Sequence, residues 1–153
     1  MGHSISGVIA PKDTLAGLSG TFGTLRYAEL EQGFAFLPLD DSDLGGIIDF
    51  DLADSIGRFG YLTPALLALL EKASTTGGLA YVETEYFGGM GNQGAAAFLD
   101  GSVALEPEVG IGSINKALAV LGAKMTSGSF DLFDAIGLDR YRSNRRAQLM
   151  ANK

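Results

Sequence analysis

The chain has 153 residues, the length of one ordinary domain with a sizeable core. Its composition, 46% hydrophobic and 19% charged, excludes a disordered protein. The net charge of −7 argues against nucleic-acid binding, which needs clustered Lys and Arg. The absence of cysteine excludes disulfides, thiolate metal sites and cysteine nucleophiles.

The charge is unevenly distributed along the chain. Residues 1–137 carry a net charge of −11, whereas residues 138–153 carry +4. We therefore predict one domain over residues 1–137 and a basic tail over 138–153 that is partly ordered or flexible. An acidic body attracts basic molecules, so a basic protein partner is one interpretation. Solubility alone is the simpler one, and a homo-oligomer is left open.

The N-terminus and the longest apolar stretch bear on localisation. The first residues contain no basic region followed by an apolar segment, so we expect no signal peptide. The longest apolar stretch, residues 61–70, contains Thr63 and Pro64 and is too short to span a bilayer. We expect a cytoplasmic protein without a membrane partner.

Taken in chain order, the first elements are a strand and a helix. Apolar residues over 4–10 predict the strand, and Pro11 is suited to the first turn of a helix that ends near Gly20. Residues 24–30 and 33–38 predict two more strands around a glycine turn. Asp40 or Asp41 is then expected to cap a short helix that ends near residue 48.

The strongest helix signal follows Thr63, which is suited to the cap, and Pro64, which is suited to the first helical position. Apolar residues surround this helix, so we expect it to be buried on all sides rather than amphipathic. Three strands are then predicted, over residues 79–87, 95–99 and 103–106.

The last elements are set by turn and cap residues. Asp100-Gly101 predicts a tight hairpin turn between two strands. Ser113 is expected to cap a helix, and a final short helix is expected to begin at Ser129 and to bury Phe130. The order of elements predicts an α+β fold with an antiparallel or mixed sheet of about 5–6 strands. We expect the helices to pack mainly on one face of that sheet.

The best candidate site lies on the strand over residues 79–87. Glu83 and Glu85 are two residues apart, so both carboxylates point to one face, with Tyr81 and Phe87 beside them. Such carboxylates could act as an acid–base pair or hold a divalent cation. They could also belong to a protein-binding face with the flanking aromatic rings, or simply to a charged surface that faces solvent.

A glycine-rich segment follows this strand. Gly89, Gly91 and Gly94 match the spacing of dinucleotide-binding loops, but the next residues predict a strand instead of the long helix that such a site needs. We therefore interpret Phe87–Gly94 as a flexible hairpin loop, and we expect no cofactor. Asn92 and Gln93 are its polar side chains, and we expect Gln93 to order the loop by bonding to neighbouring backbone.

Other polar residues offer little catalytic chemistry. The acidic clusters at 40–43 and 49–54 lack the glycine and glutamate spacing of a calcium loop. His3 is the only histidine, which excludes a multi-histidine zinc site. We therefore assign no catalytic residue and no metal ligand.

The segment over residues 81–96, with the pattern Y-x-E-x-E-Y-F-G-G-x-G-x-Q-x-A-A, resembles a group of small uncharacterised bacterial proteins. The resemblance extends to residues 2–5, 32–35, 114–118 and 130–138, and thus to most of the chain. It implies a bacterial origin but no particular activity. In its shape and acidity the chain is also similar to immunity proteins, which neutralise toxins by binding them.

These observations favour a non-enzymatic, bacterial protein-binding domain, with binding candidates on one strand and its loop: Tyr81, Glu83, Glu85, Phe87, Asn92 and Gln93. The alternative is a small-ligand-binding protein or an enzyme that uses Glu83 and Glu85, with or without a divalent metal. This alternative requires a concave pocket around the two carboxylates.

Overall fold

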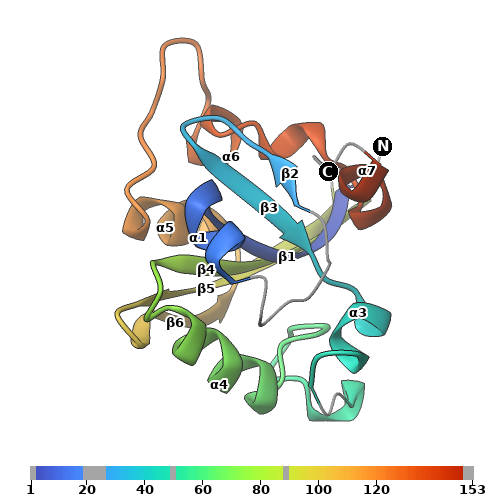
Figure 1. The fold of residues 1–153 in the computed structure, drawn as a ribbon. Coiled ribbons are helices and arrows are strands. Elements are labelled where there is room, and N and C mark those ends of the chain that lie inside the picture. Colours follow the sequence, from blue (N-terminus) through green and yellow to red (C-terminus); the bar gives the residue numbers. More distant parts are fainter. Residues whose placement is uncertain (1–2, 19–26, 49–50, 88–89, 150–153) are drawn as a thin grey trace.

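The computed structural model describes residues 3–18, 27–48, 51–87 and 90–149. Its centre is a six-stranded antiparallel sheet in the order β2-β3-β1-β4-β5-β6, which confirms the predicted α+β fold (Figure 1). The strands are β1 (His3–Pro11), β2 (Ala28–Glu29), β3 (Phe34–Pro38), β4 (Leu79–Phe87), β5 (Met90–Leu99) and β6 (Ser102–Val109).

The helices are short, and they connect or follow these strands. They are α1 (Lys12–Gly17), α3 (Asp41–Gly45), α4 (Pro64–Ala73), α5 (Ser113–Val120), α6 (Leu132–Ala135) and α7 (Asn144–Leu149), with two 3-10 turns, η1 (Leu52–Asp54) and η2 (Leu138–Arg140). No helix within the described ranges is long and apolar enough to cross a membrane.

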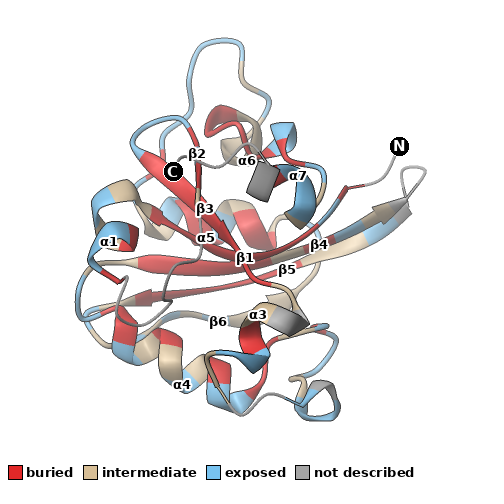
Figure 2. Cartoon of the chain, turned by 45° about the vertical axis from the view of Figure 1, so that its right-hand side comes forward, coloured by how far each residue is buried: buried red, intermediate tan, exposed pale blue. Residues whose placement is uncertain are grey.

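Helices cover both faces of the sheet, so the prediction that they pack mainly on one face is wrong (Figure 2). The reason is visible in the central strands, which are apolar on both sides. Tyr81 and Val82 are neighbours on β4 and point to opposite faces, yet both are fully buried. Side chains of α5, α6 and α7 pack on the Val82 face, and side chains of α1, α3 and α4 pack on the Tyr81 face.

Two helix starts follow the predicted capping chemistry. The Thr63 side chain accepts a hydrogen bond from the amide of Leu66, with Pro64 in the first turn of α4. Asp40 forms a reciprocal capping box with Asp43 at the start of α3. However, α4 is amphipathic rather than buried on all sides, because Ala65 lies in solvent and only one stripe of leucines faces the sheet.

Two other helix starts differ from the prediction. The cap of α5 is Gly112, whose φ of +85° favours glycine, and Ser113 is already the first helical residue. Helix α6 is capped by Asp131 instead of Ser129. Phe130 therefore precedes the helix and is 90% exposed, whereas we had expected it to be buried.

The C-terminal segment belongs to the folded domain, so the predicted boundary at residue 137 falls inside the folded unit. Leu138, Tyr141 and Ala147 are buried in the same core as α5. The segment also extends the sheet beside the first residues of β1, where the amide of Ser4 donates to the carbonyl of Arg142 at 2.8 Å. The side chains of Arg140, Arg142, Arg145 and Arg146 are exposed on the outside of this segment.

The hairpin between β4 and β5 is tighter than predicted. Strand β5 begins at Met90, so Asn92 and Gln93 lie in a strand and not in a flexible loop. Gly91 pairs with Tyr86, and a Cβ at Gly91 would lie 1.8 Å from the carbonyl oxygen of Glu85. The glycine at this position therefore permits a close approach of two strands. At the next hairpin, Asp100 and Gly101 both have positive φ, as the predicted tight turn requires.

Candidate functional site

The site begins with a polar row on the face of the sheet that also carries Leu79 and Tyr81. Beyond Tyr81, the residues of β4 on this face are Glu83 and Glu85. Glu83 lies between Ser6 of β1 and Gly94 of β5, and Glu85 lies between Ser4 and Asn92. Two rows of polar residues thus cross three strands at the end of the sheet.

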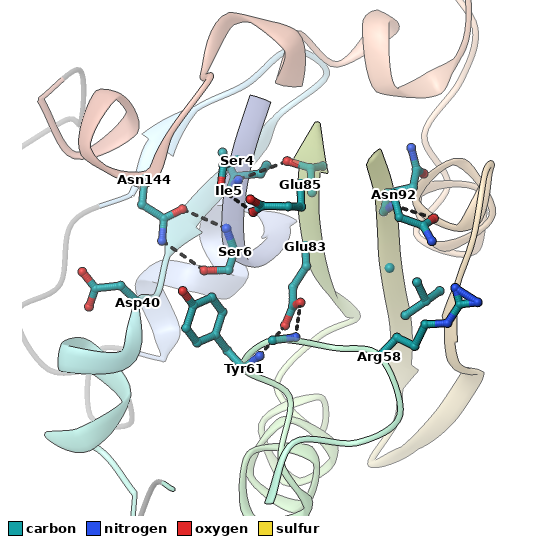
Figure 3. Close-up of a pocket in the computed structure, with 15 residues that line it drawn as sticks. Ser4, Ile5, Ser6, Asp40, Arg58, Tyr61, Glu83, Glu85, Asn92 and Asn144 are labelled. Carbon is teal, nitrogen blue, oxygen red and sulfur yellow. Dashed lines mark hydrogen bonds between the residues drawn. The ribbon is translucent and has the colours of Figure 1, made fainter. Parts of the chain in front are cut away.

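These rows form the floor of a pocket of about 530 Å³, drawn in Figure 3. Its remaining walls come from the segment before α3, from the loop between η1 and α4, and from the start of α7. The lining residues are Ser4, Ile5, Ser6, Asp40, Arg58, Gly60, Tyr61, Glu83, Thr84, Glu85, Asn92, Gln93, Gly94, Val109 and Asn144.

The carboxylate of Glu83 anchors the loop that forms one wall. Its Oε1 accepts a hydrogen bond from the amide of Gly60 at 2.7 Å, and its Oε2 accepts from the amide of Tyr61 at 2.9 Å. The hydroxyl of Tyr81 donates to Oε2 at 2.5 Å. With three donors from the protein itself, Glu83 is largely committed to holding the loop against the sheet.

Tyr81 supports this anchor from below. Its ring is fully buried in the core, where it contacts the ring of Phe59 at a centroid distance of 6.2 Å. Burial raises the pKa of Tyr81 well above its ordinary value, and the neighbouring charge of Glu83 raises it further. The phenol therefore stays protonated and donates to the carboxylate over the whole physiological pH range.

Glu85 is in a different state. It is exposed, and the hydroxyl of Ser4 donates a hydrogen bond to its Oε2 at 3.0 Å. The ion pairs formed within the described part of the chain join Lys12 to Glu29, Lys116 to Glu108 and Arg140 to Glu31, and Glu85 is in none of them. Its charge faces the pocket without a cationic partner from those residues.

The opposite wall depends on the C-terminal segment. Asn144 accepts from the amide of Ser6 through Oδ1 at 2.8 Å, and its Nδ2 donates to the hydroxyl of Ser6 at 3.1 Å. The same hydroxyl donates to the carbonyl of Leu39 at 2.7 Å. These bonds hold β1, α7 and the segment before Asp40 together around the pocket.

Gln93 connects the pocket to helix α5, as its predicted anchoring role requires. Its Oε1 accepts from the amide of Ile114 at 2.9 Å, and its Nε2 donates to the hydroxyl of Tyr86 at 3.0 Å. Its carbonyl also accepts from the amide of Gly110 at 2.7 Å. Gln93 therefore fixes the turn between β6 and α5 rather than a loop of its own.

The structure thus places four of the predicted binding residues along the pocket: Glu83, Glu85, Asn92 and Gln93. The side chains of Glu83, Glu85 and Asn92 lie on one face of the sheet, whereas that of Gln93 points to the opposite face, toward Tyr86 and Ile114. Tyr81 lies beneath the pocket, in the core, and is not the exposed aromatic residue that we predicted. Phe87 is the last residue of β4, and its side chain lies outside the described part of the chain.

Seven further polar residues that line the pocket were not predicted as binding residues: Ser4, Ser6, Asp40, Arg58, Tyr61, Thr84 and Asn144. Ser4 and Ser6 alternate with Ile5 on β1, and this alternation was a usable signal of a polar strand face. The loop carrying Arg58 and the helix carrying Asn144 reach the pocket only through tertiary packing, so no local pattern marks them.

The arrangement is better suited to binding than to acid–base catalysis. An acid–base pair needs two carboxylates that can both exchange protons with a substrate, but the protein's own donors occupy Glu83. Among the described residues, no group of three or more His, Cys, Asp and Glu side chains is placed to hold a metal ion. What the pocket offers is a set of hydroxyls and amides with charged groups at separate positions.

Comparison of the chain with protein-family models, with curated protein sequences and with solved structures gives no match. The resemblance of residues 81–96 to a bacterial group therefore stays a prediction from the sequence.

Proposed function

We propose that this protein is a non-enzymatic domain that binds a small polar molecule in the pocket around Glu85. The observation that carries the proposal is the 530 Å³ cavity, which is in the range of small-molecule sites and lies over two polar rows of the sheet. The sequence left open a small-ligand-binding protein as the alternative to a protein-binding domain, and this alternative required a concave pocket around Glu83 and Glu85.

The structure of the walls supports this proposal. Hydrogen bonds between separate segments hold each wall in place, through Glu83 on one side and through Asn144 on the other. A pocket that is organised before the ligand arrives loses less conformational entropy on binding. Glu85, Asn92 and Arg58 are among the polar residues that line this pocket (Figure 3).

The test is a binding screen against a defined panel of amino acids, amines, sugars and phosphate compounds, read by thermal shift and by side-chain amide signals in NMR. We expect binding to shift the signals of Asn92 and Asn144, which line the pocket. Asn92→Trp should abolish the effect because the indole fills the cavity. Ala104→Trp is the matched control, on an exposed position of β6 outside the pocket.

A panel in which no compound shifts either signal would contradict the proposal. So would a compound that binds equally well to Asn92→Trp, because it would occupy another site. Both variants must first show wild-type melting, so that a lost signal reports the pocket and not the fold.

A second candidate function is the predicted binding of a basic protein partner in the cytoplasm. It is favoured by two exposed apolar side chains, Ile111 at 93% and Phe130 at 90%, on a chain with a net charge of −7. Phe130 belongs to the segment between α5 and α6, which projects from the body as a loop (orange in Figure 1). Cross-linking to a basic protein that is lost in a Phe130→Ser, Ile111→Ser double variant, but kept in Glu85→Gln, would favour this function over the first.

A further inference from the structure

The charges of the pocket are separated by sign across its width. Three carboxylates and one guanidinium line it, from Asp40, Glu83, Glu85 and Arg58. Figure 3 shows Asp40 and Arg58 on opposite sides, with the two glutamates between them. A ligand that spans the cavity therefore meets negative charge at one end and positive charge at the other.

The acidic side is rich in acceptors for a cationic group. Among the residues that the structure describes, the hydroxyl of Ser4 alone donates to Glu85, and a carboxylate can accept up to about four hydrogen bonds. Asp40 is half-buried and carries a second charge, although it also caps α3 by accepting from the amide of Asp43. An ammonium group is a compact donor of three hydrogen bonds and fits acceptors arranged in this way.

The basic side offers one group that suits a carboxylate. Arg58 is exposed on the loop held by Glu83, and it forms no ion pair with any other described residue. Its planar guanidinium can donate two parallel hydrogen bonds to a carboxylate. Glu83 holds the backbone of this loop by accepting from the amides of Gly60 and Tyr61. These bonds do not involve the side chain of Arg58.

We propose that the ligand is a zwitterion, with an ammonium group at the Glu85 side of the pocket and a carboxylate at the Arg58 side. This inference rests on the proposed function and names its ligand class. Among the described residues, no group of three or more His, Cys, Asp and Glu side chains is placed to hold a metal ion. The separated carboxylates of the pocket therefore suit an extended organic cation better than a metal ion. A simple anion would face three carboxylates and is disfavoured by their repulsion.

The experiment compares four matched series of linear compounds by calorimetry: ω-amino carboxylates, diamines, dicarboxylates and neutral diols, each of increasing chain length. We expect the tightest dissociation constant for an ω-amino carboxylate that spans the pocket. Glycine should bind more weakly, because its two charges are too close together to reach both sides. Glu85→Gln and Arg58→Gln should each weaken binding by about tenfold or more, as for loss of a charge-assisted hydrogen bond.

Matched controls remove the same charges elsewhere. Glu106→Gln lies on the exposed side of β6, and Arg146→Gln lies on α7, and neither residue lines the pocket. Both should keep the wild-type dissociation constant. Glu85→Asp retains the charge and should recover part of the affinity that Glu85→Gln loses.

Each other outcome is decisive. If diamines bind best and Arg58→Gln strengthens them, the pocket binds simple cations, so the zwitterion is wrong and the proposed function stands. The same holds if dicarboxylates or diols bind best. If none of the four series binds but another compound of the polar panel does, the proposed zwitterion is wrong and the proposed binding of a small polar molecule stands. If no compound of either set binds, the proposed function fails with it.

Discussion

Along β4, the residues Leu79–Val82 are buried on both faces of the sheet, whereas Glu83 and Glu85 border a polar pocket. Both halves belong to one continuous strand with unbroken pairing to β1 and β5. The difference lies in what covers them. Figure 2 shows helices above and below the first half, and shows the far ends of β4 and β5 extending beyond this cover.

The polar half also contains two kinds of polar residue. Glu83 and Gln93 bond to backbone amides and to the hydroxyls of Tyr81 and Tyr86, and they hold the loop at Gly60 and the turn before α5. Glu85 is exposed and bonded to the hydroxyl of Ser4. We conclude that the buried half and the anchoring residues determine stability, and that Glu85 is available for a ligand.

The largest expected effect comes from the buried half. Tyr81→Ala removes a fully buried ring from the core and also removes a donor to Glu83. The free energy of unfolding should fall by about 3–5 kcal/mol, as for other large aromatic residues truncated in a core. Urea denaturation measures it. Tyr81→Phe keeps the ring and should cost much less, and equal losses in the two variants would contradict the assignment of Tyr81 to the core.

Glu83→Ala should have the next largest effect, because it leaves two backbone amides and a buried hydroxyl without their acceptor. We expect a loss of about 2–3 kcal/mol in the free energy of unfolding. Hydrogen exchange should become faster at the amides of Gly60 and Tyr61. Unchanged exchange at these two amides would show that the carboxylate does not anchor the loop.

Gln93→Ala should cost about 1–2 kcal/mol, since the amide of Ile114 and the hydroxyl of Tyr86 lose their partner. Asn92→Ala is the comparison on the adjacent position, where the side chain accepts from the backbone amide of Gln93 and from no other described residue. It should change stability by less than about 0.5 kcal/mol. Equal melting temperatures for the two variants would show that Gln93 does not anchor the turn before α5.

The buried histidine at the start of β1, His3, should make the stability of the protein depend on pH. His3 lies against Thr84 and the ring of Phe133, and burial lowers its pKa, with the charge of Arg142 acting in the same direction. The carbonyl of Leu138 and the charge of Asp139 oppose this shift but do not reverse it.

Because the folded protein holds this imidazole neutral, the unfolded chain binds the proton more strongly. Stability should therefore decrease as the pH falls below the unfolded pKa of about 6.5, and the decrease should end once the pH is below the folded pKa. Melting temperatures of the wild type and of His3→Gln over this range measure the effect. A variant with the same pH dependence as the wild type would assign it to other groups.

The sequence predicted the fold class and the order of elements because these depend on local signals. Thr63-Pro64, Asp40 and Asp100-Gly101 each specify a cap or a turn through their own backbone preferences. The coverage of both sheet faces was missed, because alternation on β4 was interpreted as one apolar and one polar face. In the structure, Tyr81 lies on the face that was expected to be polar and exposed, yet its ring is buried and its hydroxyl bonds to the carboxylate of Glu83.

Only part of the candidate site was predicted, because local sequence signals do not show which distant segments meet in the fold. The two glutamates were found because both lie on one strand, but their different roles depend on Gly60, Tyr61 and Ser4, which are distant in the sequence. Arg58 and Asn144 reach the pocket only after the chain has folded.

The smallest expected effect on stability is that of Glu85→Gln. Glu85 is exposed, and a glutamine side chain can still accept from the hydroxyl of Ser4. Glu85 has no ion-pair partner among the described residues, and such an exposed carboxylate contributes little to folding, so the free energy of unfolding should change by less than about 0.5 kcal/mol. Glu83→Gln, two residues earlier on the same face, should cost more, because an amide is a weaker acceptor for three donors than a carboxylate. Measuring both variants in urea compares one substitution in two environments. Equal losses would mean that Glu85 also supports the fold, and a ligand role for it would then need separate evidence.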